Sequence, residues 1–375
     1  MRIGSSRLLD PALAAAELAN ALYQPQAGLV VVFAACNFDL DVLGPRLREA
    51  FGDTPLIGCT TSGNIGPEGY QDQGLTGFSL AAADLDFELA LLENIGSVPQ
   101  RDATAFAHAL RDRLFTHRPG VSPERCFGFM LIDGLCGREE SIARAFHDGL
   151  GGLSLAGGSA GDDLAFRETR VLFQGRFVSD AAVLLVATTP HPFSVFKTQH
   201  FVPEDERMVV TGAIPERRIV TEINGLPAAV EYARIVGLDP TTLGPQAFAA
   251  HPVVVRIGNA DFVRSIQQLN EDGTLTFFCA IDRGIVLKTV LGKDMLTNLD
   301  ETLRQVKEAI GPPALIIGCD CILRQLECRE RGLLGTVGDR LRADHVVGFS
   351  TFGEQFRGMH INQTFTGIAL GGGNP

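Results

Sequence analysis

The sequence contains no tryptophan and only 3 tyrosines, against 24 phenylalanines, so its aromatic core consists almost entirely of Phe. It has no uninterrupted apolar run of roughly 18 residues, the length that a membrane-spanning helix requires. It also begins without the basic and then apolar segments of a secretory leader. These absences exclude an ordinary membrane-spanning protein and predict a cytoplasmic one.

Basic residues are in the minority. The chain has 32 Lys and Arg against 44 Asp and Glu, which gives a formal net charge of −12. Such a surface repels phosphate backbones and anionic lipids, so we expect neither nucleic acid nor a membrane as a partner. With 375 residues, of which 45% are hydrophobic, the chain is too long for one ordinary core and predicts two domains or three structural units.

A glycine-rich segment occurs near both ends of the chain. Leu56–Gly63 and Val346–Gly353 both contain the pattern Gly-x-Ser/Thr-Thr-x-Gly, and each is followed by Thr-Gly before an apolar residue. A less regular copy lies at Leu155–Gly161. We interpret these glycines as allowing tight crossings between strands, because no helix follows them as it would in a phosphate-binding loop. The sequence therefore predicts one unit repeated three times.

Each repeat has the same expected order of elements. An apolar run typical of a buried strand comes first, and then a helix, a glycine-containing strand and a hairpin. In the third repeat the helix is expected over 330–341. The region 190–292 differs, since it has short strands and hairpin turns such as Asn270–Gly273. The predicted fold class is α/β, with repeated strand-helix-strand-hairpin units forming mixed sheets and an antiparallel β-rich segment in the C-terminal half.

Three segments resemble the hallmark segments of FIST-domain proteins, namely Leu56–Gly63, Ile223–Ala229 and Gly348–Gln355. The resemblance implies a FIST N domain over 25–189, a FIST C domain over 190–375 and a role in bacterial signal transduction. Before these domains, a capping aspartate and a proline at Asp10-Pro11 predict an N-terminal helix within residues 1–24. No nucleophile motif with an evident His or acid partner occurs, so we do not expect an enzyme.

Further segments resemble a nitric-oxide-sensing subgroup of this family, whose members bind haem. They are Phe196–Phe201, Val263–Gln267, Phe277–Asp282 and Gly318–Leu323. The resemblance implies a haem-dependent nitric oxide sensor that regulates a partner histidine kinase or a cyclic-di-nucleotide signalling enzyme. Whether the chain forms a homodimer is left open.

Haem requires a strong axial ligand in an apolar pocket. His200 is the first candidate, because an extended strand places it on one face with Phe196 and Thr198. Lys197 is then a candidate partner for a haem propionate. His360 is the second candidate, at the head of a polar strand face. The alternative for His200 is a structural role, in which the ring is hydrogen-bonded to the backbone. The alternative for His360 is that its polar strand face lines a ligand groove or simply faces water.

Two further groups of residues are candidate binding sites. Glu354, Gln355 and Asn362 are expected to line a ligand pocket, because only the last repeat carries an acid and an amide at its turn. Cys319, Cys321 and Cys328 form the densest group of thiols and predict a zinc or redox site, although three thiolates are fewer ligands than a structural zinc site requires. Two alternatives to the haem sensor therefore remain: a haem-free sensor of an amino-acid-like ligand, and a thiol or zinc redox sensor.

Overall fold

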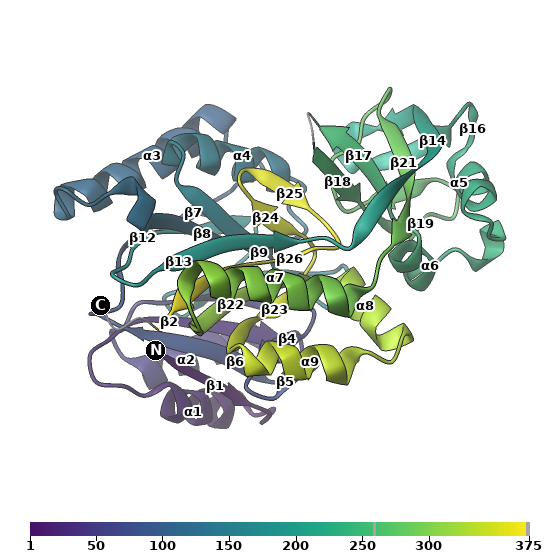
Figure 1. Ribbon diagram of the computed structural model, residues 1–375. Coiled ribbons are helices and arrows are strands. Elements are labelled where there is room, and N and C mark those ends of the chain that lie inside the picture. The colour runs from purple at the N-terminus through teal and green to yellow at the C-terminus, as the bar shows by residue number, and fades with distance from the viewer. Residues whose placement is uncertain (258–259, 373–375) are drawn as a thin grey trace.

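The computed structural model describes residues 1–257 and 260–372. Its described strands form three six-stranded sheets and one eight-stranded antiparallel sheet. We call the three six-stranded sheets and their helices the body. The eight-stranded sheet with its two short helices, residues 201–292, is the inserted lobe, which lies to the upper right of the body in Figure 1. The mixed α/β class and the antiparallel segment predicted from the sequence are both confirmed.

The body contains three repeats of one unit, as the glycine segments predict. In each unit two parallel strands flank a helical connection, and a third strand pairs antiparallel with the first. Unit 1 consists of β2 (Ala27–Ala35), α2 (Leu40–Phe51), β3 (Leu56–Thr61) and β6 (Leu75–Ala81). Unit 2 consists of β8 (Cys126–Ile132), α4 (Glu139–Leu150), β9 (Ser154–Ser159) and β12 (Ala181–Thr188). Unit 3 consists of β22 (Pro313–Cys321), α8 (Ile322–Glu330), α9 (Leu334–Ala343), β23 (Val346–Thr351) and β26 (Phe365–Gly371).

The helix expected over 330–341 is wrong in extent. Two helices, α8 and α9, fill this region, and the first of them starts directly after β22. Gly332, with a φ of 66°, lies in the turn between them. Most of α8 is buried although it carries arginine, glutamine and glutamate, so its polar composition conceals it from an analysis of hydrophobic periodicity.

The hairpin that follows the second strand of each unit leaves its own sheet. The hairpin β4 (Asn64–Gly66) and β5 (Gly69–Gln71) of unit 1 pairs with β23 of unit 3. The hairpin β24 (Glu354–Phe356) and β25 (Met359–Ile361) of unit 3 pairs with β9 of unit 2. The hairpin β10 (Val171–Phe173) and β11 (Arg176–Val178) of unit 2 pairs with β3 of unit 1. The three exchanges close a ring, so every sheet of the body combines chain from two units.

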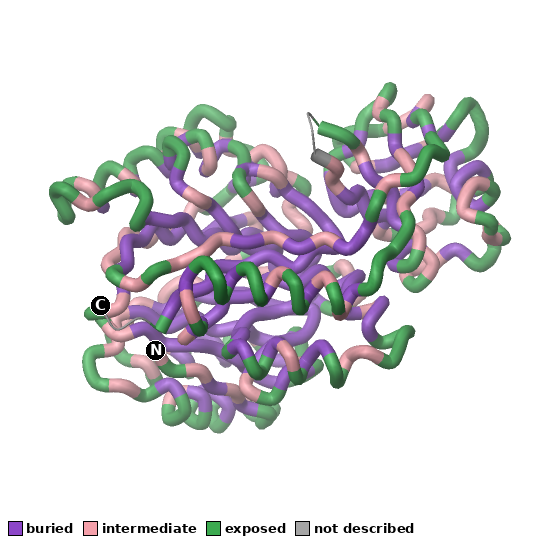
Figure 2. Tube along the Cα trace, viewed as in Figure 1, coloured by how far each residue is buried: buried purple, intermediate pink, exposed green. Residues whose placement is uncertain are grey.

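Edge strands and outer helices complete the body. The strands β1 (Arg2–Ser6), β7 (Asp86–Glu93) and β13 (Phe193–Thr198) pair with β6, β12 and β26. The helices α1 (Pro11–Leu22), α3 (Gln100–His117) and α7 (Met295–Ile310) cover the outer faces. Asp10 caps α1 by accepting from the amides of Ala12 and Leu13. The strands are buried while the outward turns of α3 and α7 are exposed (Figure 2).

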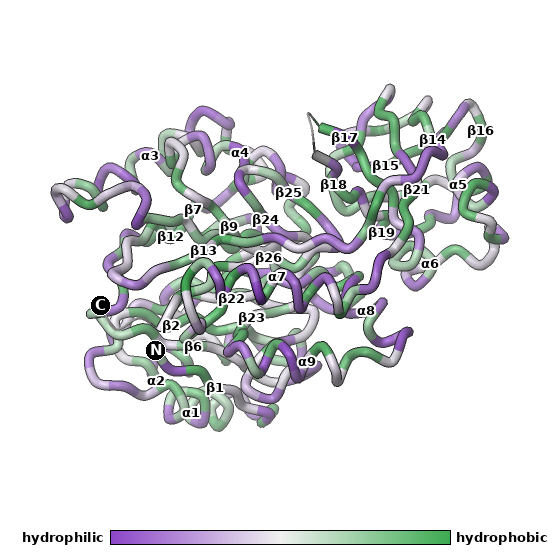
Figure 3. The backbone as a smooth tube through the Cα atoms, viewed as in Figure 1, coloured by the Kyte–Doolittle hydropathy of each residue, from purple (hydrophilic) through white to green (hydrophobic). Residues whose placement is uncertain are grey.

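One apolar cluster joins the sheets of the body. It takes residues from all three units, and the stacked rings of Phe33 and Phe349, with centroids 4.8 Å apart, join unit 1 to unit 3. The strands of the body are hydrophobic and the outer helices carry the hydrophilic positions (Figure 3). No helix within the described residues is long and apolar enough to cross a membrane.

The inserted lobe has its own core around Tyr232 and Phe248. Its strands are β14 (Phe201–Ile214), β15 (Ile219–Ile223), β16 (Leu226–Pro227), β17 (Val253–Ile257), β18 (Ala260–Arg264), β19 (Ile266–Leu269), β20 (Leu275–Phe277) and β21 (Val286–Gly292), and its helices are α5 (Ala228–Val236) and α6 (Pro245–Ala250). The turn expected at Asn270–Gly273 joins β19 to β20. The lobe is therefore an insertion between β13 and α7 of the body.

Candidate functional site

Each of the three hairpin crossings has a polar residue at the equivalent position. The side chain of this residue is hydrogen-bonded to the segment that follows it. Asn64 donates from Nδ2 to the carbonyl of Gly74 (3.0 Å). Asp162 accepts from the amides of residues 166–168 at 2.7–3.0 Å. Glu354 accepts from the hydroxyl of Thr364 (2.6 Å). In the first and third units the side chain is ten positions before its partner, so the predicted pocket residue Glu354 has a structural role here.

Glu354 is fully buried, and burial raises its pKa to about 8, with Asp320 adding to this while hydrogen bonds from Thr351 and Thr364 oppose it. A carboxyl whose pKa is higher in the folded state than in the unfolded state stabilises the fold at low pH and loses that contribution as the pH rises. We therefore expect Glu354 to contribute a decline in the free energy of unfolding between about pH 5 and about pH 8, of at most about 1.4 kcal/mol for each unit of pKa difference.

The Glu354→Gln variant should lack most of this decline. The equivalent position in unit 1 is the neutral amide of Asn64, so an uncharged side chain suits the crossing. Urea unfolding at the two pH values measures the difference for both proteins. A decline of the same size in the variant would assign the pH dependence to another group.

His200 lies in the junction between β13 and β14, and both of its ring nitrogens are already bonded. Nε2 lies 2.9 Å from a carboxylate oxygen of Glu327, and Nδ1 lies 3.3 Å from a guanidinium nitrogen of Arg324. Burial lowers the pKa of His200, and Arg324 adds to this, while Glu327 opposes it. Lys197 lies with its amine 5.3 Å from the ring centroid of Phe262, and burial lowers its pKa.

His360 also lies against the protein on both sides of its ring. Nδ1 lies 3.1 Å from the amide nitrogen of Gln355. Nε2 lies only 2.6 Å from the point where a Cβ of Gly353 would stand. Neither histidine offers a nitrogen facing an apolar slot, so the described residues do not fit a haem at either position. The two histidines also have different neighbours. His200 contacts α8, whereas His360 belongs to β25 and contacts Gln355 of the same hairpin.

The three cysteines predicted as a metal or redox group lie in three different parts of the core. Cys319 belongs to the central cluster, Cys321 packs with Phe278 and Phe352, and the thiol of Cys328 lies 3.2 Å from the sulfur of Met295. Burial raises the pKa of all three thiols. Over residues 1–257 and 260–372, no three His, Cys, Asp or Glu side chains are placed to hold a metal ion.

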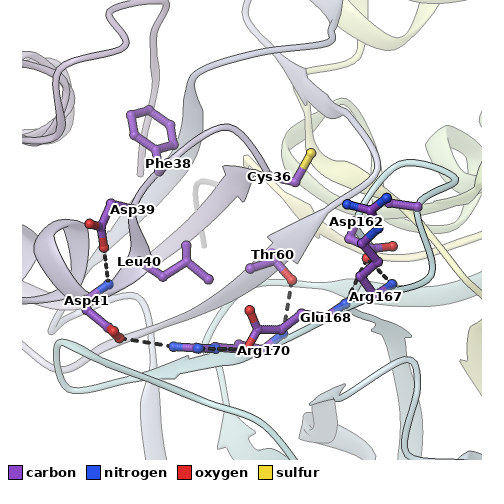
Figure 4. Close-up of a pocket in the computed structure, with 11 residues that line it drawn as sticks. Cys36, Phe38, Asp39, Leu40, Asp41, Thr60, Asp162, Arg167, Glu168 and Arg170 are labelled. Atoms are coloured by element: carbon purple, nitrogen blue, oxygen red, sulfur yellow. Dashed lines mark hydrogen bonds and ion pairs between the residues drawn. The ribbon is translucent and has the colours of Figure 1, made fainter.

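A cleft of about 420 Å³ lies where β2 and β3 of unit 1 end and α2 begins. We call it the α2 cleft. Figure 4 shows Phe38, Asp39 and Asp41 on one side of it and Asp162 and Arg167 on the other. The lining residues are Cys36, Phe38, Asp39, Leu40, Asp41, Thr60, Asp162, Ala165, Arg167, Glu168 and Arg170.

Local rules explain this geometry. Asp39 caps α2 by accepting from the amide of Asp41 (3.1 Å), which fixes the start of the helix at the end of β2. Thr60, at the end of β3, accepts from the amide of Arg170 (3.1 Å) and so holds the loop of unit 2 across the cleft. Asp162 folds that loop and places Arg167 at its rim. Ligands of α/β proteins commonly bind beyond the carboxyl ends of parallel strands, and the α2 cleft lies at that position.

The α2 cleft carries both signs of charge. Arg170 pairs with Asp41 (3.1 Å) and Glu168 (2.6 Å). Arg167 has no carboxylate within ion-pair distance among the described residues. The thiol of Cys36 donates to Asp163 (2.8 Å), and burial raises its pKa to about 12, so it remains a neutral thiol. The cleft can therefore accept a ligand that carries an anion and a cation together.

Sequence reasoning missed this cleft. Asp162 and Asp163 are adjacent in the sequence, which first suggests a catalytic dyad. Neighbouring residues of an extended chain point to opposite faces, however, so the pair does not form a dyad by itself. The signal in the sequence is an aspartate cap directly after a buried strand, at Asp39. The sequence does not reveal that the hairpin of unit 2 pairs with β3 of unit 1, and this pairing brings a loop of unit 2 onto the strand ends of unit 1.

Comparisons with known proteins place the chain. The family model for the FIST N domain matches residues 28–226, and that for the FIST C domain matches residues 228–357. No curated protein shows significant similarity to the chain. The crystal structure of a cyanuric acid hydrolase from A. caulinodans is similar over 99% of this chain and 99% of that chain, at 12% identity and a TM-score of 0.37, a level that supports no argument about function.

Proposed function

Because the chain belongs to the FIST family, whose domains are sensors in signal transduction rather than catalysts, we propose that it is a haem-free sensor of a small, amino-acid-like zwitterion. The observation that carries the proposal is the α2 cleft, with its two signs of charge at the ends of two parallel strands. Its volume of about 420 Å³ lies within the range of small-molecule sites, roughly 300–1,000 Å³.

The charges of the cleft suit a zwitterion in one orientation. The guanidinium of Arg167 pairs with the ligand carboxylate through two parallel hydrogen bonds, the arrangement that arginine favours. The ligand ammonium then lies near Asp39 and Asp41 across the cleft, and Phe38 and Leu40 contact an apolar side chain. A cation alone would leave the guanidinium of Arg167 without a carboxylate partner.

The signal is expected to pass to a separate protein. FIST sensor domains typically act on partner signalling proteins, and a histidine kinase or a cyclic-di-nucleotide enzyme is the partner that we propose. The cleft combines residues of two units, so a bound ligand contacts both of them. A ligand changes a protein's state only through different affinities for two states, and the packing of units 1 and 2 at this cleft is where we expect those states to differ.

Isothermal titration calorimetry with L-leucine, 4-methylpentanoate and 3-methylbutylamine tests the proposal, because the last two compounds each carry only one of the two charges. We expect L-leucine to bind best and Arg167→Gln to raise its dissociation constant at least about tenfold, since loss of a charge-assisted pair costs about 1.4 kcal/mol or more. The matched control is Arg101→Gln, an exposed arginine on α3. Equal binding of the carboxylate alone, or an unchanged affinity in Arg167→Gln, would refute the zwitterion site.

Haem-dependent sensing of nitric oxide stays a competing prediction, which rests on the resemblance and not on a fitting site. Stoichiometric haem uptake, with a Soret band that moves with nitric oxide and is lost in His200→Ala, would overturn the haem-free proposal. The thiol or zinc sensor likewise stays a prediction. It requires Cys319, Cys321 and Cys328 to leave three separate core clusters before they can share an ion.

A further inference from the structure

A group of buried polar side chains lies where the inserted lobe meets the body. We call it the seam. It consists of Arg264 and Ser265 of the lobe and Gln355, His360 and Asn362 of the body, and β18 contacts β25 there. Within the part of the chain that the structure describes, four atoms of the seam have no hydrogen-bond partner: Ser265 Oγ, Gln355 Oε1, His360 Nε2 and Asn362 Oδ1.

Such a cluster is unusual, because roughly nine in ten buried polar groups in proteins are bonded. All five side chains are at least nine-tenths buried, and Arg264, at 7% exposure, is the most accessible of them. His360 Nε2 and Asn362 Nδ2 each lie within 3 Å of the same point, where a Cβ of Gly353 would stand, at 2.6 and 2.9 Å. His360 and Asn362 are therefore close together, Gln355 joins them through its contact with Nδ1 of His360, and Arg264 joins them through the carbonyl of His360.

The existing bonds define which free atoms donate and which accept. The amide nitrogen of Gln355 can only donate, so His360 accepts at Nδ1 and carries its hydrogen on Nε2. Burial lowers the pKa of His360 to about 4, with Arg218 and Arg264 adding to this and Glu140 opposing it, so the ring is neutral near pH 7. The amide nitrogen of Asn362 donates to the carbonyl of Phe352 (3.2 Å), which leaves Oδ1 as a free acceptor.

Arg264 is a buried cation without an acidic partner. It donates to the backbone carbonyl of His360 (3.2 Å), and no carboxylate lies within 4.0 Å of it among the described residues. The two acids nearby are committed elsewhere, because Arg218 pairs with Glu139 (2.5 Å) and with Glu140 (2.6 Å). Burial of a charge without a partner is costly, so the seam favours an anion.

We propose that the seam is a second ligand site, which binds a small hydroxycarboxylate. The carboxylate accepts from the guanidinium of Arg264 and from Nε2–H of His360. The hydroxyl donates to the free amide oxygen of Gln355 or Asn362. A hydroxyl fits better than an ammonium because the guanidinium of Arg264 already places a cation here that has no carboxylate partner among the described residues. This inference is independent of the α2 cleft, with which the seam shares no residue.

Access to the seam requires the lobe to move away from the body. The chain enters and leaves the lobe at one junction, where the amide of Lys293 donates to the carbonyl of His200 (2.7 Å). Away from this junction the lobe is held by two kinds of contact. The polar ones include the pairs of Arg218, the amide of Ala280, which donates to Glu140 (2.5 Å), and Gln363, which donates to the carbonyl of Ala249 (3.1 Å). The apolar ones join Phe278 and Ala249 of the lobe to a cluster that includes Phe352 of the body. Rotation about the junction would have to break both kinds of contact to uncover the seam.

Nuclear magnetic resonance of the full chain with ¹⁵N-labelled histidine tests the inference, because Nε2 of His360 reports directly on a new acceptor. The probes are glycolate, acetate, which lacks the hydroxyl, and glycolamide, which lacks the charge. We expect glycolate to shift this resonance saturably, acetate to bind roughly fivefold more weakly, as loss of one hydrogen bond implies, and glycolamide to give no saturable shift.

Arg264→Met should abolish the glycolate response, and Arg256→Met should retain it. Arg256 is the matched control, an exposed arginine of the same hairpin that pairs with Asp261. Should Arg264→Met fail to fold, Asn362→Ala provides a second variant, which removes a free acceptor for the hydroxyl and is expected to weaken binding roughly fivefold. An unmoved resonance with all three probes means that water alone fills the seam and overturns the inference, and so does an equal response in Arg264→Met. Neither result bears on the binding of L-leucine, which Arg167 controls.

Discussion

Replacement of Gly348 by alanine is expected to destabilise the protein by more than about 3 kcal/mol, which is beyond the usual range for a single substitution. A Cβ at this position would stand 1.7 Å from the carbonyl oxygen of Gly318, on the parallel neighbour strand β22. The obstacle is backbone, so no change of rotamer relieves it. The same close approach recurs in the other units, where a Cβ at Gly58 or Gly157 would lie 1.8 or 2.1 Å from a carbonyl oxygen.

Urea unfolding followed by circular dichroism measures this effect, and Gly335→Ala is the matched control. Gly335 lies in α9, nothing lies within 4 Å of the place of its Cβ, and alanine favours the helix. We expect that control to stabilise the protein by roughly half a kcal/mol. A Gly348→Ala protein as stable as the parent would show that the crossing does not require glycine.

These crossings explain why the repeat could be predicted from the sequence. The close approach of two parallel strands excludes every side chain at Gly58, Gly157 and Gly348. Only glycine can occupy these positions, so the glycines themselves mark the crossings in the sequence. The buried strands could also be predicted from the sequence, because strands that are covered on both faces must be apolar throughout. Phe196, Thr198 and His200 are buried, but β13 ends at Thr198, so the extended strand that was expected to carry His200 stops two residues before it.

The exchange of the hairpins could not be predicted in the same way. An edge strand offers the same backbone groups whichever strand arrives, so the sequence shows that a hairpin forms and not which sheet accepts it. The α2 cleft and the seam both depend on this exchange, since each combines segments about 100 residues apart. The hydrogen-bond partners of His200 could not be predicted from the sequence either. Glu327 and Arg324 lie on α8, whose buried polar residues do not follow the pattern of an amphipathic helix.

Arg324→Met is expected to cost about 3–5 kcal/mol, the usual effect of removing one partner from a buried ion pair. Arg324 is 1% exposed and donates to a carboxylate oxygen of Asp320 (2.7 Å), which is also 1% exposed. The hydroxyl of Tyr70 donates to the other oxygen of Asp320. Methionine fills much of the space of the arginine, so the loss should come chiefly from the uncompensated charge of Asp320.

The charge explanation makes a further prediction. Without Arg324, the buried carboxylate of Asp320 has lost the cation beside it, so a neutral amide at this position should be tolerated better. The double variant Arg324→Met with Asp320→Asn should therefore recover part of the loss in urea unfolding. A loss that is unchanged in the double variant would instead point to packing.

Arg329→Met separates this effect from a general weakening of α8. Arg329 lies on the same helix but is exposed, and its pair with Asp72 is a surface ion pair, so the change should stay within about 1 kcal/mol. Arg324 also contacts His200, at the junction where the chain enters the lobe. Amide hydrogen exchange at that junction should therefore accelerate in Arg324→Met and stay at the parent rate in Arg329→Met. If both variants exchange at the parent rate, the buried network stabilises unit 3 alone and does not restrain the lobe.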